Sequence, residues 1–303
     1  MLNSGVEMTI VPPLRDLGDG FKVRRALPSR DKRTIGPFVF FDQFGPAQFE
    51  AGKGLDVRPH PHIGLATVTY LLGGEILHRD SLGTEQRIHP GAMNWMTAGR
   101  GIVHSERTAA DTRRDASFLS GLQCWVALPR QHEEDEPSFS HTAVSELPWI
   151  EGDGIAARLI TGEMFGRRSP VKTLSPMVFV EIQLQPGSSL PIAADYTERA
   201  LYPIGGAIDL GAEGVFEAGQ MVVLKPGATV ICRCAGTNAV TLALIGGEPL
   251  DGPRYIAWNF VSSSRDRILH AAEDWRLKKF PAVPNETEFI PLPENFRAPV
   301  DYP

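Results

Sequence analysis

The sequence predicts an all-β protein made of two similar antiparallel domains in tandem, with one helix near the C-terminus. Three observations support this fold class. Glycine and proline number 30 and 25 in a chain of 303 residues, so turns interrupt the chain too often for long helices. The segments between the turns are short and rich in β-branched and aromatic residues, which favour strands. A glycine pattern also occurs twice along the chain.

The strand-like segments form two groups, which an acidic stretch separates. The first group begins with a short buried strand, GPFVFFDQFGP (Gly36 to Pro46), and continues with ATVTYLLGG, MNWMTAG and CWVALP. The second group comprises ARLITG, MVFVEIQLQPG, AIDLG, GQMVVLKPG, TVICRC and VTLALIGG. Between them lies HEEDEP (His132 to Pro137), which we expect to be an exposed linker. These groups predict an N-terminal domain over residues 1–140 and a C-terminal domain over residues 141–303.

The repeated glycine pattern indicates that the two domains are related. GGEI at residues 73–76 is followed by Gly91, and GGAI at residues 205–208 is followed by Gly219. Both of these later glycines have another glycine eight residues further on. The simplest explanation is a pair of similar β domains, either barrels or sandwiches.

One segment, SSSRDRILHAAEDWRLKKF at residues 262–280, has the pattern of an α-helix. Ser263 and Asp266 have the spacing of a capping box at a helix start. Apolar residues then recur at helical intervals, at Ile268, Leu269, Ala272 and Trp275. We expect this helix to pack as a clasp on a β domain, and the proline-rich tail after it to lie extended over the surface.

The composition disfavours several classes of protein. No run of 18 apolar residues exists, so no segment is expected to span a membrane, and the N-terminus lacks the pattern of a signal peptide. Three cysteines, an odd number, do not predict a disulfide framework. The net charge of -6, without a basic block, disfavours direct binding to nucleic acid. We therefore expect a cytoplasmic protein that acts on a small molecule or on a protein partner.

Two pairs of residues have the spacing of metal ligands on strands. His60 and His62 stand at positions i and i+2, as do His104 and Glu106, so each pair points to one face of its strand. On facing strands the two pairs would supply three nitrogens and one carboxylate. Such a set suits iron(II), with manganese, copper or nickel possible, and leaves positions open for a substrate. A structural zinc ion fits less well, because no cysteine takes part.

The spacing alone leaves a competing choice for the second pair. His78 and Asp80 also stand at positions i and i+2, so they could replace His104 and Glu106. Ser105 should point to the opposite face of its strand and is therefore a poor candidate nucleophile. Gln123 is a candidate polar contact to a substrate in the metal pocket.

Two long motifs, HPHIGLATVTYLLGGEILHRDSLG and PGAMNWMTAGRGIVHSE, resemble the pirin family of the cupin superfamily, including its bacterial members. GLQCWVALP and GPRYIAWNFVSSS are further similar segments, so the likeness runs from about Gly36 to the end of the predicted helix. The resemblance implies two jelly-roll barrels, a bicupin. It also implies an iron ion in the N-terminal cupin, held by the residues that match the family motif: His60, His62, His104 and Glu106.

The resemblance resolves the choice between the ligand pairs. It makes His78 and Asp80 structural residues or neighbours of the ligands. A general cupin has a glutamate ligand a few residues after its His-x-His pair, but residues 63–67 contain no acid, so the carboxylate is expected from Glu106. His89 departs from the small or acidic residue that is usual before the Pro-Gly turn.

The resemblance also implies a function. Pirins of this type have quercetin 2,3-dioxygenase activity, in which O2 opens the ring of a flavonol and carbon monoxide is released. In such a reaction Glu106 would accept the proton of the flavonol hydroxyl. The alternative is a non-enzymatic, iron-dependent redox regulator that binds a transcription factor or a metabolic enzyme. A cupin that stores or senses metal is a third possibility.

The second domain is expected to lack the metal. Counting from the matched glycines places Ile192 and Ala194 where the first domain has His60 and His62. The same count places Cys232 and Cys234 at the positions of His104 and Glu106. We therefore expect a barrel filled by apolar side chains and thiols. A cysteine pair that binds a soft metal or acts in redox chemistry is the alternative.

Overall fold

The computed structural model describes residues 5–16 and 21–297, and its fold is almost entirely β, as predicted. Two compact units are present, and both are built from separate stretches of chain. Unit 1 comprises residues 1–15, 23–43 and 142–249, whereas unit 2 comprises residues 16–22, 44–141 and 250–303. In the described part of the chain, no helix is long and apolar enough to cross a bilayer.

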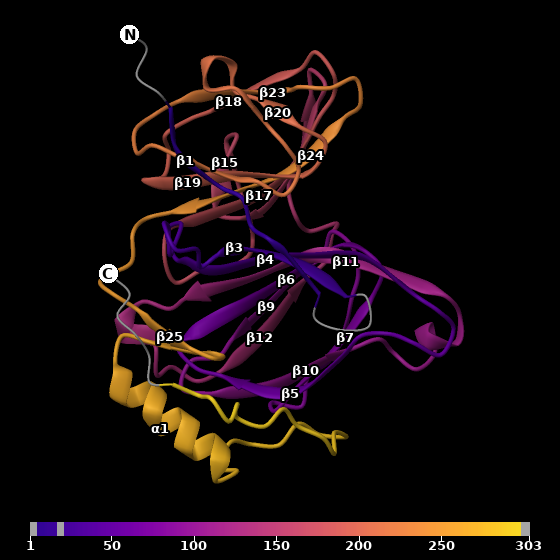
Figure 1. The fold of residues 1–303 in the computed structure, drawn as a ribbon, viewed down its shortest axis with the longest axis vertical. Coiled ribbons are helices and arrows are strands. Elements are labelled where there is room, and N and C mark those ends of the chain that lie inside the picture. Colours follow the sequence, from indigo (N-terminus) through magenta and orange to yellow (C-terminus); the bar gives the residue numbers. More distant parts are fainter. Residues whose placement is uncertain (1–4, 17–20, 298–303) are drawn as a thin grey trace. The chain divides into compact units, whose positions relative to one another are not determined.

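Unit 2 is a barrel of antiparallel strands (Figure 1). Its smaller sheet has the order β5-β10-β7-β8, with bounds Asp56–His62, Ile102–Arg107, Ile76–Asp80 and Glu85–Ile88. Facing it is a larger sheet that contains β12-β9-β6-β11, with bounds Ser138–Thr142, Met93–Thr97, Leu65–Gly73 and Ser117–Ala127. The hairpin of β25 (Tyr255–Ala257) and β26 (Phe260–Ser262), and short 3-10 turns at Thr112–Arg114 and Arg130–His132, also belong to this unit.

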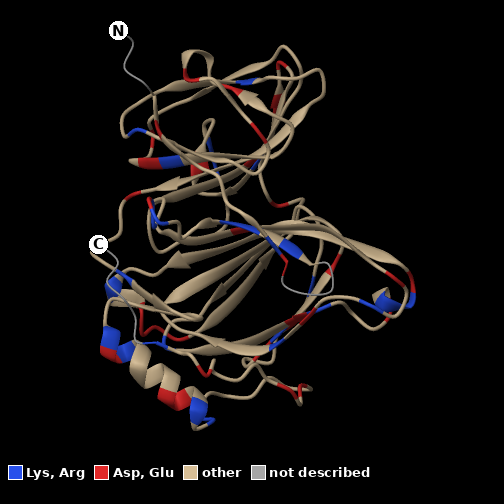
Figure 2. Cartoon of the chain, viewed as in Figure 1, with Lys and Arg blue, Asp and Glu red and all other residues tan. Residues whose placement is uncertain are grey.

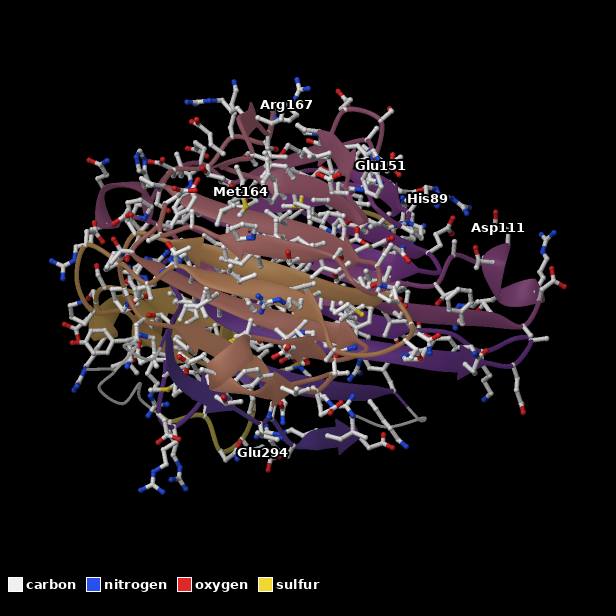
Figure 3. The ribbon with its side chains drawn as sticks, turned by 90° about the horizontal axis from the view of Figure 1, so that it is seen from above. His89, Asp111, Glu151, Met164, Arg167 and Glu294 are labelled. Atoms are coloured by element: carbon white, nitrogen blue, oxygen red, sulfur yellow. The ribbon has the colours of Figure 1, made fainter. Side chains whose placement is uncertain are left out.

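Unit 1 repeats the same plan. Its smaller sheet has the order β18-β23-β20-β21, with bounds Ser189–Ile192, Val230–Cys234, Ile208–Asp209 and Val215–Phe216. The larger sheet has the order β1-β22-β19-β24-β17-β14-β13, with bounds Val6–Ile10, Met221–Leu224, Glu198–Gly205, Val240–Gly247, Met177–Leu184, Ile155–Thr161 and Trp149–Gly152. A small hairpin joins β15 (Glu163–Met164) to β16 (Arg167–Arg168), whose Arg167 side chain is labelled in Figure 3, and a 3-10 turn covers Gly211–Glu213.

Each unit is built from separate stretches of chain, whereas the expected domains are two consecutive ones. A boundary lies at His141/Thr142, close to residue 140, but most of the first 43 residues belong to unit 1 and the last 54 belong to unit 2. Three N-terminal strands each have residues in both units: β2 (Leu14–Asp16), β3 (Lys22–Leu27) and β4 (Phe38–Phe49). The strand expected to end at Pro46 thus continues to Phe49. The division into consecutive domains 1–140 and 141–303 stays a prediction.

The predicted helix is α1 (Arg265–Arg276), with charged residues at both ends and an uncharged middle (Figure 2). Its N-cap is Ser264, whose hydroxyl accepts a hydrogen bond from the Arg267 N–H, so the start expected at Ser263 is off by one residue. The helix buries Ile268, Ala271, Ala272 and Trp275 against Ile63, Val103 and Phe260 of unit 2. Leu269, expected on the apolar face, is 42% exposed.

The expected acidic linker is wrong at one residue, Glu133, which is buried. Its carboxylate lies 2.8 Å from the Arg254 guanidinium, and it accepts hydrogen bonds from Ser262 and Ser263. The Arg254 side chain is itself 1% exposed. Burying a carboxylate requires such a partner, and the partner lies 121 residues away in the sequence.

Candidate metal centre

Three imidazoles converge inside the unit 2 barrel. His60 and His62 project from β5, and His104 projects from the neighbouring strand β10, where it is the cross-strand partner of His60. All three are buried, and their ligand nitrogens lie within 4.8 Å of one another. Among the residues that the structure describes, this is the one group of three or more potential ligands that is close enough to hold a metal ion.

In His60 and His62, a hydrogen bond at the Nδ1 atom leaves the Nε2 atom free to bind a metal. The Nδ1 of His60 lies 3.0 Å from the Arg58 carbonyl, and the Nδ1 of His62 lies 3.0 Å from the Asn259 carbonyl. A carbonyl only accepts, so each Nδ1 carries the proton and each Nε2 keeps its lone pair.

The spacing of the nitrogens fits one ion. The Nε2 atoms of His62 and His104 are 3.1 Å apart. Two ligands at right angles, each about 2.1 Å from one metal ion, lie about 3.0 Å apart. At this distance the two nitrogens either share one proton in a hydrogen bond or bind one cation. The donor set therefore fits a divalent metal ion.

A hydrogen-bonded chain supports His104 from behind. Its Nδ1 lies 3.4 Å from the Nδ1 of His78, and the Nε2 of His78 lies 3.1 Å from Asp80. Burial by itself would raise the pKa of the Asp80 carboxyl, but hydrogen bonds from His78 and Thr84 lower it overall, so Asp80 is ionised. The second candidate pair thus orients a ligand, in keeping with the place that the family resemblance gives it.

Burial keeps the three imidazoles neutral, which is the form that binds metal. Desolvation lowers the pKa of His60 to about 4. It also lowers the pKa of His62 and His104 well below the usual range, and the neighbouring imidazoles add to the effect. The protein therefore does not need to remove protons from these groups at neutral pH before a cation can bind.

Glu106 lies on the same face as His104 but outside the group of three. Its Oε1 accepts a hydrogen bond from the Thr69 hydroxyl at 3.1 Å, and burial raises the pKa of its carboxyl. The Thr69 oxygen is also 2.9 Å from Oε1 of Gln123, the predicted polar contact, which therefore reaches the same interior. Metal ligation by Glu106 stays a prediction.

The C-terminal tail, which follows α1, contacts the face of β10 that points away from the three histidines. Ser105 points away from the ligands, as predicted, and its hydroxyl donates to Glu286 at 2.8 Å. Arg107 donates to both oxygens of Glu286, and the Ile290 N–H donates to the Pro59 carbonyl of the segment that carries His60. The tail, yellow in Figure 1, accordingly runs along β5 and β10.

Sequence reasoning missed Asn259 and Glu286. Asn259 contributes only its backbone carbonyl to His62, and a carbonyl leaves no signal in a sequence. Glu286 is one acid among several in a proline-rich tail. His89, where the sequence departs from the family, has a side chain that is 60% exposed and is labelled in Figure 3.

In the second barrel, β18 and β23, the counterparts of β5 and β10, contain no histidine. Ile192 and Cys232 are buried in its apolar core, Ala194 is exposed beyond the end of β18, and Cys234 is partly exposed. The residue count was therefore wrong in register, because Cys232 lies opposite Leu190, whereas His104 lies opposite His60. Burial raises the pKa of the Cys232 thiol to about 12, so it stays protonated and is a poor metal ligand or nucleophile.

Comparison with known proteins agrees with this architecture. The family model described as Pirin matches residues 20–126, and the one described as Pirin C-terminal cupin domain matches residues 179–281. A pirin-like protein from Caulobacter vibrioides is 49% identical over 285 residues, which are 92% of this chain and 96% of the relative. Pirin from Homo sapiens is 32% identical over 280 residues, covering 90% of this chain and 93% of the relative.

A solved structure extends the likeness to three dimensions. The crystal structure of quercetin 2,3-dioxygenase from Acinetobacter baumannii matches with a TM-score of 0.84 and 35% sequence identity. The match covers 96% of this chain and 97% of that protein. The fold is thus that of two cupin barrels, of which one holds a three-histidine metal site. With matches at both barrels and close relatives along nearly its whole length, this chain belongs to the pirin family.

Proposed function

We propose that this protein is an iron-dependent flavonol 2,3-dioxygenase that uses quercetin or a similar flavonol and O2. The observation that carries the proposal is the buried cluster of His60, His62 and His104, which supplies three neutral nitrogens to one ion. Three ligands leave coordination positions open for reactants. The similarity to a quercetin 2,3-dioxygenase over nearly the whole chain supports the choice of reaction.

The ion that these residues would hold is iron(II), with Glu106 as the fourth ligand. Bound iron would supply a Lewis acid for the flavonol hydroxyl and a redox centre for O2. The chain's own residues then set the conditions of the reaction. The imidazoles would fix the position of the ion, and all three are buried in the barrel.

Glu106 is the proposed acceptor of the flavonol proton. Its carboxyl is buried, and burial raises its pKa, so it holds a proton more readily than a surface glutamate. The Thr69 hydroxyl fixes Oε1 of this carboxyl through a hydrogen bond of 3.1 Å. Glu106→Gln keeps the shape of the side chain but cannot accept the proton. In iron-loaded protein this variant should lose about 10²- to 10⁴-fold in kcat, and unchanged turnover would contradict the role.

The experiment that tests the function compares two double variants. The protein is stripped of metal, reconstituted anaerobically with iron(II), and incubated with quercetin and air while absorbance, O2 uptake and carbon monoxide are followed. His60→Ala with His62→Ala should lose both iron and turnover. His89→Ala with His270→Ala removes two exposed imidazoles, with side chains 60% and 69% exposed, and should retain both.

The outcomes separate the candidate functions. About one iron per chain, with one carbon monoxide released per flavonol consumed, supports the dioxygenase. Iron without flavonol turnover contradicts it and favours an iron-dependent redox regulator, whose affinity for a protein partner would change with the oxidation state. Failure to bind iron even after anaerobic reconstitution would overturn the metal site itself.

A further inference from the structure

The barrel wall that faces the metal centre carries a row of polar side chains. Thr69 on β6 is the cross-strand partner of both Asn94 on β9 and Gln123 on β11. Cross-strand partners point to the same face of a sheet. Because the Thr69 hydroxyl contacts Glu106, this face is the one turned toward the metal-binding sheet. Asn94, Thr69 and Gln123 therefore line the interior side by side.

Asn94 has a hydrogen-bond donor that the protein does not use. The residue is 2% exposed, and its Oδ1 accepts a hydrogen bond from Nδ1 of His141 at 2.8 Å. Its Nδ2 is buried and has no hydrogen-bond partner. Buried polar groups without partners are rare, because leaving one unsatisfied costs about 1–3 kcal/mol. An unused donor on the inward face of β9 is satisfied when a bound molecule supplies the acceptor.

Gln123 offers a second amide next to it. The Thr69 hydroxyl, which has one proton, lies 2.9 Å from Gln123 Oε1 and 3.1 Å from Glu106. When that proton goes to Glu106, the Gln123 amide turns its Nε2 toward the Thr69 oxygen, and its second N–H is left for a ligand. The row thus presents two amide donors at some distance from the three imidazoles, which lie on the facing sheet.

The adjacent row carries an indole and a thioether. Thr67, the next inward residue of β6, is partnered by Met96 on β9 and by Trp125 on β11. The Trp125 ring packs edge-on against His62, with centroids 5.2 Å apart. An indole and a thioether beside a metal site form a surface for an aromatic ring rather than for a small anion.

We propose that Asn94 and Gln123 bind a second oxygen of the substrate, away from the oxygen that the metal holds. The site then selects planar aromatic molecules that carry an outer hydroxyl or carbonyl group over those that lack one. The inference deepens the proposed function, since it takes a flavonol as the substrate. It concerns binding, however, and does not depend on whether O2 reacts.

The test measures binding without turnover. The protein is loaded with zinc(II), which does not react with O2, and titrated with two ligands. Quercetin has outer hydroxyl groups, whereas 3-hydroxyflavone keeps the metal-binding hydroxyl and carbonyl but lacks them. Wild-type protein should bind quercetin at least about tenfold more tightly, the worth of one good hydrogen bond. Asn94→Leu should remove most of this preference by weakening quercetin binding about tenfold while leaving 3-hydroxyflavone almost unchanged.

Two further variants keep the test decisive. Asn94→Asp replaces only the unused donor and keeps the oxygen near His141, so it gives the same answer if Asn94→Leu does not fold. Thr97→Val lies on the same strand but on the outward face, where its hydroxyl contacts Trp95, and it should preserve the preference. Zinc content must be equal in all variants.

The inference is overturned if the Asn94 variants weaken both ligands equally or neither. It is also overturned if the wild-type protein shows no preference or binds no flavonol. Preference lost in the variants, together with absence of quercetin turnover in iron-loaded wild type, would support the amide pair while contradicting the dioxygenase proposal. The two proposals can therefore fail separately.

Discussion

The two barrels have the same strand order, but the side chains in their interiors differ: histidines line one small sheet and aliphatic residues line the other. The small sheets run β5-β10-β7-β8 in unit 2 and β18-β23-β20-β21 in unit 1, so each strand has a counterpart thirteen elements later. On β5 the inward residues are His60 and His62, whereas on β18 Leu190 and Ile192 are buried in a core of aliphatic side chains. One backbone plan thus accommodates a metal centre or an apolar core, and a few side chains decide which.

The largest effect is expected from giving β5 the interior of β18. His60→Leu with His62→Ile leaves one imidazole of the three. Metal affinity should fall by more than about 100-fold, the upper limit for loss of an outer hydrogen-bond partner alone. Titration against a competing chelator measures the affinity, and circular dichroism checks the fold. Full iron content in this variant would show that the metal lies elsewhere.

The second prediction concerns how each barrel is held together. Unit 1 has a largely aliphatic core, and unit 2 contains an ion pair, Arg254 and Glu133, in which both side chains are buried. Arg254→Met leaves the carboxylate without its partner and should lower the free energy of unfolding of unit 2 by about 3–5 kcal/mol. Arg276→Met breaks an exposed pair with Glu273 and should change it by less than about 1 kcal/mol. Equal effects in urea unfolding would show that the buried pair is no more important than a surface one.

The third prediction uses pH to separate the interiors in metal-free protein. The pKa of His60 is about 4 in the folded chain, against its ordinary value of 6.5. Between these values the unfolded chain binds the extra proton, so stability falls as pH falls from 6.5 to 4. The loss from His60 alone is about 3 kcal/mol at pH 4. Urea unfolding at several pH values should show a steeper acid loss in the wild type than in the variant with Leu and Ile on β5. Parallel curves would contradict the assigned pKa.

The smallest expected effect concerns the hydrogen bonds that link His104 through His78 to Asp80. His78→Phe removes the link between His104 and Asp80 and should lower metal affinity about 10- to 100-fold. His132→Phe is the matched control, because His132 also pairs with an aspartate, Asp135, at 2.6 Å, but on the surface. The control should bind metal as the wild type does. An unchanged affinity in His78→Phe would make His78 a packing residue beside Phe139.

Local patterns predicted more of this protein than long-range contacts did. The glycine repeat and the strand-like segments predict two similar β domains, and the spacing of His60 and His62 predicts a shared face, whereas the choice of His104 comes from the family resemblance. These signals act within a few residues. The partners of the site do not, because the Asn259 carbonyl is 197 residues from His62 and Glu286 is 181 residues from Ser105.

The errors have the same origin. Glu133 looked like part of a solvated acidic run, since nothing nearby indicates that Arg254 will neutralise it. The count that paired Ile192 with His60 and Cys232 with His104 cannot hold for both, because Cys232 lies opposite Leu190 whereas His104 lies opposite His60. Leu269 fits the helical period, but the neighbouring elements cover the side of α1 that contains Ala271 instead.

The contact between His62 and the Asn259 carbonyl also orders events during synthesis. The two residues are 197 positions apart, so at about 5–20 residues per second the ribosome makes the second about 10–40 s after the first. Until then the imidazole lacks the carbonyl that holds its ring, and the tail that carries Glu286 is synthesised later still. Most of the barrel is made before its metal site is complete. Stable binding of the metal ion is therefore a late step, because almost the whole chain must be synthesised first.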